Sequence, residues 1–254
     1  MLQVERHNQI VSEVEKQGFV SIEDIEKVIH VSRSTIRRDL LELERMNKLV
    51  RARGGAVSKR NGTSHDPGVA FRFNMQREEK QRIAEAALKL VNERDTILLD
   101  EGTTTIELAK RLNRYHSLMV ATNDLFVARE LSAMNNINLV VAGGTLRRET
   151  NTLVGYFTEK IIGEMHADRF FLSADAIDVV HGCMCYNMEQ IPVKKGMILS
   201  AKETVLLSDH TKFEKTAFIN ICKLSEINTI ITGTEVNQEI YARLCEIGVH
   251  VILV

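Results

Sequence analysis

Residues 31–40 read VSRSTIRRDL and predict a helix able to enter the major groove of DNA. Ser32 is a candidate N-cap, and helical spacing continues to about Met46. Ile36 and Leu40 are four residues apart and can pack against a preceding helix. The first turns of the helix carry hydroxyl and guanidinium groups, which bond base edges and phosphates. We therefore expect DNA contacts from Ser32, Arg33, Ser34, Thr35, Arg37 and Arg38.

Two predicted helices precede this segment, and a predicted β-hairpin follows it. Apolar residues at helical spacing predict a helix over 3–17, and Ser21 with Asp24 resembles a capping box that begins a second helix. Residues 49–58 alternate apolar and basic side chains around Gly54-Gly55, which predicts a short β-hairpin, or wing. Arg51 and Arg53 of the wing could reach a phosphate or the minor groove. Residues 1–58 thus predict a winged helix-turn-helix DNA-binding domain.

The charge distribution supports a nucleic-acid partner at this end of the chain. The 254 residues carry a net charge of −1, whereas residues 32–60 hold nine basic side chains against three acidic ones. A basic patch against an acidic remainder points to a bound polyanion, here a double-stranded DNA operator.

Cysteine usage and hydropathy indicate the compartment. The four cysteines, at 183, 185, 222 and 245, are not spaced like a disulfide framework, which favours a reducing environment. No stretch approaches the roughly 18 apolar residues of a membrane span, and the N-terminus lacks the apolar region of a signal peptide. The sequence predicts a cytoplasmic protein with no membrane partner.

The remainder of the chain predicts a second domain of the α/β class. Residues 59–77 hold one of the two prolines and read as a linker; residues 78–254 alternate helical patterns with short apolar runs. Continuous apolar runs between helices are typical of strands buried on both faces, and hence of a mostly parallel sheet. The runs are TILLD (96–100), SLMVAT (117–122), INLVVAGG (137–144), DRFFLSA (168–174), TVLLSD (204–209), TIITG (229–233) and VHVILV (249–254).

Polar residues after these runs are candidates for a ligand site, because ligands of open parallel sheets lie at the carboxyl ends of strands. After the first run, a Gly and three Thr stand where a helix begins, and free N–H groups there attract anions. Lysines could neutralise a phosphate or carboxylate, and aspartates could bind sugar hydroxyls. The candidates are Asp100, Glu101, Gly102, Thr103, Thr104, Thr105, Asn123, Asp124, Gly143, Gly144, Asp175, Lys194, Asp209 and Lys212.

Each candidate also has a simpler interpretation. Thr103 could merely cap a helix, and Gly143-Gly144 could be only a turn. Lys194 and Lys195 could belong to a solvated helix face. The segment HGCMC (181–185) offers a histidine and two cysteines, but a zinc site needs about four ligands and no second cluster is evident. We therefore expect neither a metal nor a cofactor.

Several segments resemble the DeoR family of bacterial repressors. Arg6, Ile10 and Val14, followed by Ser32-x2-TIRRDL, are similar to the family's helix-turn-helix signature, and LVRARGGA is similar to its wing. Further along, LLDEGTTT resembles the family's LDxGTT loop, ATNDL its TNSL segment and VAGGTL its GG turn. Lys194-Lys195 resembles its KR pair, and SDHTKF its D-x-x-KF motif.

The resemblance implies a sensor domain whose fold is similar to ribose-5-phosphate isomerase and whose effector is a phosphorylated sugar. It also implies a homodimer or homotetramer. Four residues depart from the family pattern. Glu101 places a carboxylate beside the expected anion site, Asp124 stands where Ser is common, and Asp175 where a small residue is common; Gly233 stands where Asp is common. The effector could therefore be a sugar acid or polyol derivative instead.

Two other functional classes remain open from sequence. An aldose–ketose isomerase carrying a DNA-binding domain needs a positioned base, and Asp100, Glu101 and Asp209 are available carboxylates. An activator or structural DNA-binding protein would differ from a repressor in the sign of its effect on transcription. The favoured hypothesis is a repressor of a carbohydrate-catabolic operon that a small metabolite releases from its operator, rather than an enzyme.

Overall fold

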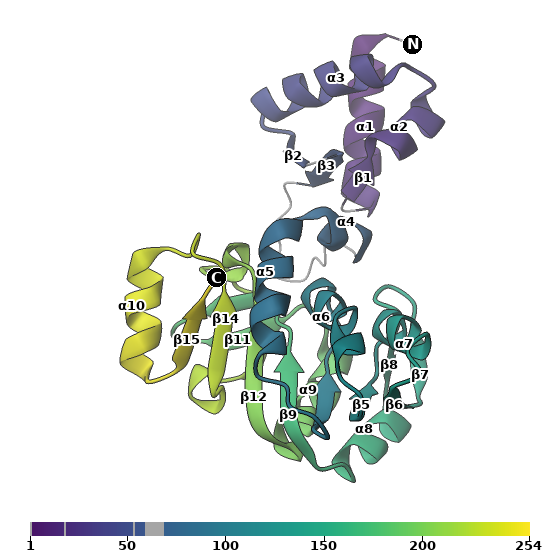
Figure 1. The fold of residues 1–254 in the computed structure, drawn as a ribbon. Helices are drawn as coiled ribbons and strands as arrows, with labels where there is room; N and C mark the ends of the chain where they lie inside the picture. Colours follow the sequence, from purple (N-terminus) through teal and green to yellow (C-terminus); the bar gives the residue numbers. More distant parts are fainter. Residues whose placement is uncertain (1, 18, 53, 59–68) are drawn as a thin grey trace. The chain divides into compact units, whose positions relative to one another are not determined.

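The computed structural model describes residues 2–17, 19–52, 54–58 and 69–254. The chain divides into two compact units, Met1–Met75 and Gln76–Val254, called here the N-terminal unit and the C-terminal unit (Figure 1). Each is described by itself. In the part of the chain that is described, no helix is both long and apolar enough to cross a membrane.

The N-terminal unit is a winged helix-turn-helix, as predicted. It contains α1 (Gln3–Gln17), α2 (Ile22–Ile29) and α3 (Arg33–Arg45), followed by the hairpin strands β2 (Leu49–Ala52) and β3 (Gly55–Ser58). The side chain of Ser21 accepts the N–H of Asp24 to cap α2, and that of Ser32 accepts the N–H of Thr35 to cap α3. One strand was not predicted: β1 (Phe19–Ser21) pairs antiparallel with β3 and widens the wing to three strands.

The core of this unit explains why three short helices hold together. Apolar residues from α1, α2, α3 and the wing form one buried cluster, in which Ile10, Ile25, Ile36, Leu40 and Leu49 are at most 2% exposed. Ile36 and Leu40 face this cluster, so the arginines between and beside them point outward.

The segment predicted as a linker is only partly described. Residues 59–68 lie outside the described residues. The rest of it contains the short helix α4 (Val69–Asn74) and the first residue of α5 (Arg77–Leu88). The boundaries of the linker stay a prediction.

The C-terminal unit is built on a seven-stranded sheet in which every strand pair is parallel, with the order β15-β14-β12-β9-β4-β5-β6. All seven predicted apolar runs form these strands. In chain order the strands are β4 (Thr96–Leu99), β5 (Leu118–Thr122), β6 (Ile137–Val141), β9 (Ala167–Leu172), β12 (Ala201–Leu207), β14 (Thr229–Thr232) and β15 (His250–Leu253).

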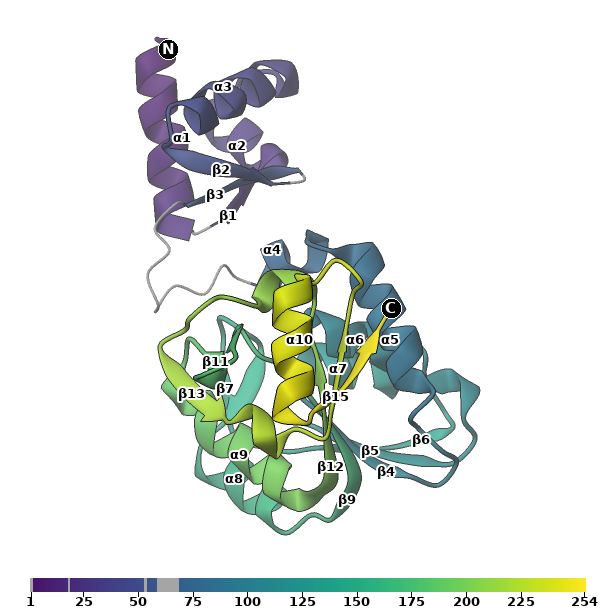
Figure 2. The ribbon, with the colours of Figure 1, turned by 90° about the vertical axis from the view of Figure 1, so that its left-hand side faces the viewer.

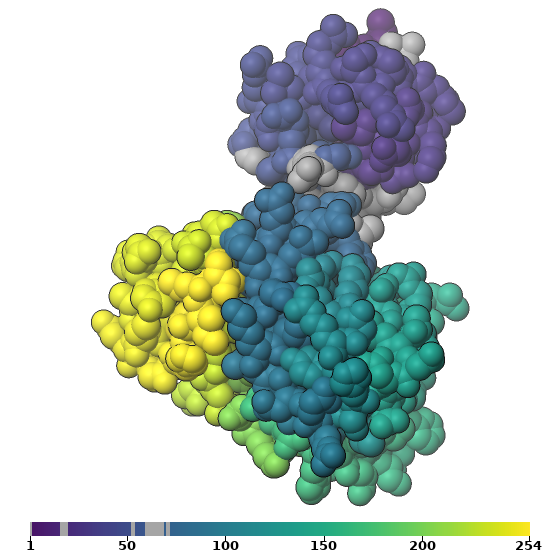
Figure 3. All heavy atoms as spheres, in the orientation of Figure 1, coloured from purple at the N-terminus to yellow at the C-terminus, as the bar shows by residue number. Residues whose placement is uncertain are grey.

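Helices cover both faces of the sheet, which is why its strands are apolar throughout. On one face lie α5, α6 (Thr103–Ala109) and α7 (Leu125–Ser132); on the other lie α8 (Tyr156–Gly163), α9 (Ile191–Ser200) and α10 (Gln238–Ile247) (Figure 2). In the space-filling view α5, in blue, crosses its face of the unit between the yellow C-terminal region and the teal α6–α7 region (Figure 3).

Smaller elements lie at the carboxyl edge and flanks of the sheet. Strands β7 (Thr145–Arg147) and β8 (Thr152–Val154) form a hairpin, and β10 (Ala176–Asp178), β11 (Gly182–Cys185) and β13 (Ile219–Cys222) form a small antiparallel sheet. Single turns of 3₁₀-helix occur at η1 (Leu112–Arg114), η2 (Met188–Gln190), η3 (His210–Lys212) and η4 (Leu224–Glu226). Because all seven strands of the large sheet are parallel, their following loops lie along one edge.

Candidate nucleic-acid interface and ligand site

The exposed face of α3 carries two kinds of arginine. Arg37 and Arg38 are exposed, and within the described residues neither has an ion-pair or hydrogen-bond partner. Arg33 is held instead by Glu26 at 2.9 Å and Glu23 at 3.3 Å, both on α2. The guanidinium groups of Arg37 and Arg38 are therefore the ones free to meet a phosphate or a base.

The hydroxyl groups at the start of α3 are close together. Oγ of Ser32 lies 2.9 Å from both Oγ of Ser34 and Oγ1 of Thr35. Both contacts are exposed, so these hydroxyls can exchange them for a base edge or a phosphate, and DNA contact by them stays a prediction.

A carboxylate on α3 binds the wing. Glu44 accepts the backbone N–H of Arg51 at 2.9 Å and its Nε at 2.7 Å, and this pairing lowers the pKa of Glu44. A groove of about 320 Å³ lies between α3 and the wing, lined by Ile22, Arg37, Leu40, Arg51, Gly54 and Gly55. Arg53, the other predicted wing contact, lies outside the described residues.

Asp39, which sequence reasoning did not single out, holds α3 against α1. Its side chain is fully buried, accepts two bonds from Arg6 at 2.5 and 2.9 Å, and lies 3.2 Å from Nε2 of His7. Burial alone would raise the pKa of Asp39, but Arg6 and His7 outweigh burial and lower it. Asp39 is thus an ionised structural anchor under the exposed Arg37 and Arg38.

At the carboxyl edge of the large sheet, the structure brings several predicted site residues into direct contact. Asp100 follows β4, and its carboxylate accepts Nζ of Lys194 at 2.5 Å and the backbone N–H of Ser173 at 2.9 Å. Oε1 of Glu101 lies 3.6 Å from the same ammonium. Asp100, Glu101 and Lys194 form a buried charged cluster with two acids and one base.

Lys194 is therefore not on a solvated helix face; it is 3% exposed, unlike its exposed neighbour Lys195. Burial disfavours its ammonium, but Asp100 and Glu101 more than compensate and hold the pKa of Lys194 above its ordinary value. Its charge is already neutralised within the protein. The prediction that Lys194 neutralises a bound anion stays a prediction, and it requires a ligand that competes with Asp100.

Asp124 adds a third acid to this region. It follows β5 and caps α7 by accepting the N–H groups of Phe126 and Val127. Burial, opposed by these bonds and aided by the charge of Asp100, raises the pKa of Asp124 to about 6.

Replacing Asp124 by Asn should alter how stability depends on pH. The folded state binds this proton more tightly than the unfolded chain, so protonation stabilises the fold, and that stability is lost as pH rises from about 4 through 6. Asn keeps the helix cap without ionising. The free energy of unfolding of Asp124→Asn, relative to that of the unmodified protein, should therefore rise by up to about 3 kcal/mol between pH 4 and pH 8. Urea titrations of both proteins at pH 4 and pH 8 measure this difference. If the two proteins differed in unfolding free energy by the same amount at both pH values, the raised pKa of Asp124 would be contradicted.

Further candidate residues at this edge are buried and closely packed. Asn123 donates through Nδ2 to the carbonyl of Leu153, whereas its Oδ1 is one of the few buried side-chain nitrogen or oxygen atoms in the described residues without a hydrogen-bond partner. Gly102 has φ +141°, and a Cβ there would overlap the Ser173 hydroxyl, so this position requires glycine. Thr103, Thr104 and Thr105 are all buried in the first turn of α6.

The remaining candidates lie along the same edge but outside the central cluster. The carbonyl of Gly143 accepts the hydroxyl of Thr158, and Gly144 leaves room for that side chain, which supports a structural turn. Asp175 accepts the N–H of Tyr186. Asp209 caps η3 by accepting the N–H and hydroxyl of Thr211, and Lys212 lies at the end of that turn, partly exposed. Ligand contact by all of these residues stays a prediction.

The HGCMC segment contributes its cysteines to the small antiparallel sheet. Cys183 and Cys185 are buried on β11, and Cys183 pairs across the small sheet with Cys222. The described residues bring together one group of potential metal ligands, and it contains no residue of this segment.

An exposed basic helix and wing, in a chain that also holds a parallel α/β unit with a polar carboxyl edge, define a DNA-binding transcriptional regulator. Comparison with known proteins agrees. Residues 6–61 match the model of the DeoR-like helix-turn-helix domain, and residues 75–234 match that of the DeoR C terminal sensor domain. The chain belongs to the DeoR family of transcriptional regulators.

Relatives are similar along nearly their whole length. A putative aga operon transcriptional repressor of Escherichia coli O157:H7 is 32% identical over 98% of this chain and 93% of its own. The glycerol-3-phosphate regulon repressor of Escherichia coli K12 is 32% identical over 91% of each chain. The HTH-type transcriptional repressor GlcR of Bacillus subtilis 168 is 32% identical over 100% of this chain and 97% of its own.

Among solved structures, ribose 5-phosphate isomerase A from Methanocaldococcus jannaschii is similar over 54% of each chain, with 18% identity and a TM-score of 0.41. The eIF2B delta subunit of Chaetomium thermophilum covers 63% of this chain and 58% of its own, with 16% identity and a TM-score of 0.45. Scores this low carry no argument about function.

Proposed function

We propose that this regulator is a repressor of a carbohydrate-related operon and that a small, hydroxyl-rich metabolite bound at the carboxyl edge of the sheet lowers its affinity for DNA. The observation that carries the proposal is the buried Oδ1 of Asn123, an acceptor without a hydrogen-bond partner, at the carboxyl edge that also carries Asp100, Glu101 and Asp124. Such acceptors suit sugar or polyol hydroxyls. The names of the relatives, which are repressors of aga and glycerol-3-phosphate genes, support the same class.

An anionic group on this metabolite would need a cationic partner other than Lys194. Lys212 is the better candidate, because it is partly exposed and has no ion pair among the described residues. It also lies near a second lysine: burial, together with the charge of Lys212, lowers the pKa of Lys215. Two neighbouring ammonium groups favour a phosphate or carboxylate between them. We propose a sugar or polyol phosphate, or a sugar acid, as the effector.

The same geometry supports a sensor over an isomerase. A general base must be free to reach the proton of its substrate. Here Asp100 is bonded to Lys194 and two backbone N–H groups, Glu101 lies 3.6 Å from the same ammonium, and Asp209 caps η3. Turnover of sugar phosphates by the purified protein would contradict this part of the proposal. We further propose a homodimer or homotetramer, because helix-turn-helix proteins usually read paired half-sites.

The experiment is a thermal-shift screen of sugar phosphates, polyol phosphates and sugar acids on the full chain. A specific ligand at 100 times its Kd stabilises the folded state by about 2.7 kcal/mol. Thr104→Val and Lys212→Ala should reduce the shift while leaving DNA binding without ligand unchanged. Lys202→Ala is the matched control, because Lys202 lies near the opposite end of β12 from Asp209 and Lys212. Equal shifts in all variants would remove Thr104 and Lys212 from the site.

A further inference from the structure

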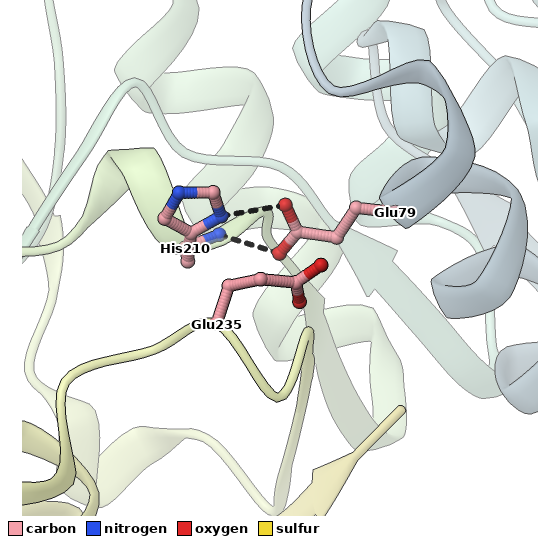
Figure 4. Close-up of side chains that lie close together, drawn as sticks. All are labelled: Glu79, His210 and Glu235. Carbon is pink, nitrogen blue, oxygen red and sulfur yellow. Dashed lines mark hydrogen bonds and ion pairs between the residues drawn. The ribbon is translucent and has the colours of Figure 1, made fainter.

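Three potential metal ligands from distant parts of the sequence meet at one end of the C-terminal unit. Glu79 lies on α5, His210 on η3 after β12, and Glu235 in the loop between β14 and α10. One ligand atom from each lies within 4.8 Å of the others (Figure 4). No other such group is found among the described residues.

Glu79 is a fixed, buried carboxylate. It is 2% exposed, and Oε1 accepts the backbone N–H of His210 at 2.7 Å and that of Gly233 at 3.1 Å. Oε2 lies 2.7 Å from Nδ1 of His210, so the imidazole is oriented toward the carboxylate before any ion arrives. Ligands held in place in this way lose little conformational entropy on binding a metal.

Glu235 brings a second carboxylate to the same point. A Cβ built on Gly233 would overlap both Oε2 of Glu235 and Oε1 of Glu79, so these two oxygens flank the space that the absent side chain leaves. Two carboxylate oxygens on either side of one small space repel each other unless a cation lies near them. Glycine at position 233 therefore allows the two carboxylates to approach this point together.

The positive charge that lies beside Glu235 in this structure is the guanidinium group of Arg82. One of its nitrogens, Nη2, contacts both carboxylate oxygens of Glu235, at 2.6 and 2.8 Å. The Arg82 side chain is 41% exposed, and an ion pair with that much exposure contributes little free energy. Arg82 can therefore withdraw into water at small cost, and it contacts Glu235 without contacting Glu79.

We propose that Glu79, His210 and Glu235 bind a divalent first-row transition ion of the zinc type, with Arg82 as its intramolecular competitor. One imidazole nitrogen and two carboxylate oxygens suit such an ion at bonds of about 2.0–2.2 Å, whereas calcium and magnesium prefer oxygen ligands alone. Without an ion, Nδ1 of His210 carries the proton that it donates to the Glu79 carboxylate. Binding an ion through Nδ1 requires the tautomer with its proton on Nε2, so that the Nδ1 lone pair is available. Water would fill the fourth coordination position of the ion, because the Glu235 side chain is 43% exposed.

The bound ion would join three segments that hydrogen bonds and the Arg82–Glu235 ion pair connect in its absence. These are α5, the 209–212 turn and the loop after β14. The turn also carries Lys212, so metal occupancy would stiffen one side of the proposed effector site. Metal binding itself does not depend on that site.

The test is calorimetric titration of the tag-free, chelator-treated full chain with Zn²⁺, in a Cys245→Ser background because Cys245 is an exposed thiol. Co²⁺ titration followed by visible absorption reports on the ligand set. We expect one equivalent per chain, and at least tenfold weaker binding in Glu235→Gln and His210→Ala. Arg82→Gln should bind several-fold tighter, because it removes the competitor.

Glu239→Gln and His181→Ala are matched controls, since both residues are outside the cluster, and they should bind Zn²⁺ as the parent does. Glu235 and Arg82 are partly exposed, so their variants should fold, and thermal melts verify this. Absence of stoichiometric binding by the parent would overturn the proposal. So would binding that Glu235→Gln and His210→Ala leave unchanged, or that Arg82→Gln weakens.

Discussion

Replacing both Arg37 and Arg38 by alanine is expected to weaken operator binding at least a hundredfold while leaving both units folded. Each specific arginine contact to a base contributes about 1–3 kcal/mol, and each phosphate contact adds a salt-dependent share. The two side chains are exposed and take no part in the core that holds α3 in place. The double substitution should therefore lower the affinity for DNA without unfolding the helix.

Gel-shift or fluorescence-anisotropy titrations at several salt concentrations measure this effect. The slope of log K against log salt should become shallower by about 0.9 for each phosphate that the variant no longer neutralises. Arg45→Ala is the matched control, because Arg45 lies in the last turn of the same helix, away from the end expected to contact bases. Retained affinity in the double variant, or an equal weakening in Arg45→Ala, would refute the assignment of α3 as the DNA-reading helix.

The sequence predicts the architecture well because the signals behind it are local. The seven apolar runs all form strands, since a strand covered on both faces must be apolar along its length. The helix-turn-helix was predicted from two serine caps and the spacing of Ile36 and Leu40, all within a few residues. The third wing strand was missed, because three residues carry too short a pattern to read.

Side-chain partners were harder to predict, because they join residues far apart in sequence. Lys194 meets Asp100 across 94 residues, and Glu79 meets His210 across 131. Neither pairing leaves a trace in composition or periodicity. Thus Lys194 was interpreted as a ligand contact or a solvated side chain, and the structure shows a buried ion pair. Asp39 was missed for the same reason, although a charged residue between Ile36 and Leu40 could have suggested a buried partner.

Replacing Lys194 by methionine should destabilise the C-terminal unit by about 3–5 kcal/mol. Methionine retains the length and apolar stem of lysine but removes the ammonium that Asp100 contacts at 2.5 Å and Glu101 at 3.6 Å. Two carboxylates would then lie buried without their counter-charge, and breaking a buried pair by removing one partner costs this much. The raised pKa of Lys194 agrees, because it means that the folded protein holds the charged form strongly.

Urea denaturation of the full chain, followed by a probe in the C-terminal unit, measures the destabilisation. Lys195→Met is the matched control, since Lys195 is exposed beside Lys194 on the same helix and should change stability little. Adding Asp100→Asn to Lys194→Met should restore part of the stability, because it removes one of the two buried charges, and its single amide oxygen can still accept one of the two N–H groups that Asp100 accepts from Glu101 and Ser173. If Lys194→Met were as stable as the parent, Asp100 and Glu101 could not both be ionised in the folded protein. The acidic character proposed for the ligand site would then have to be abandoned.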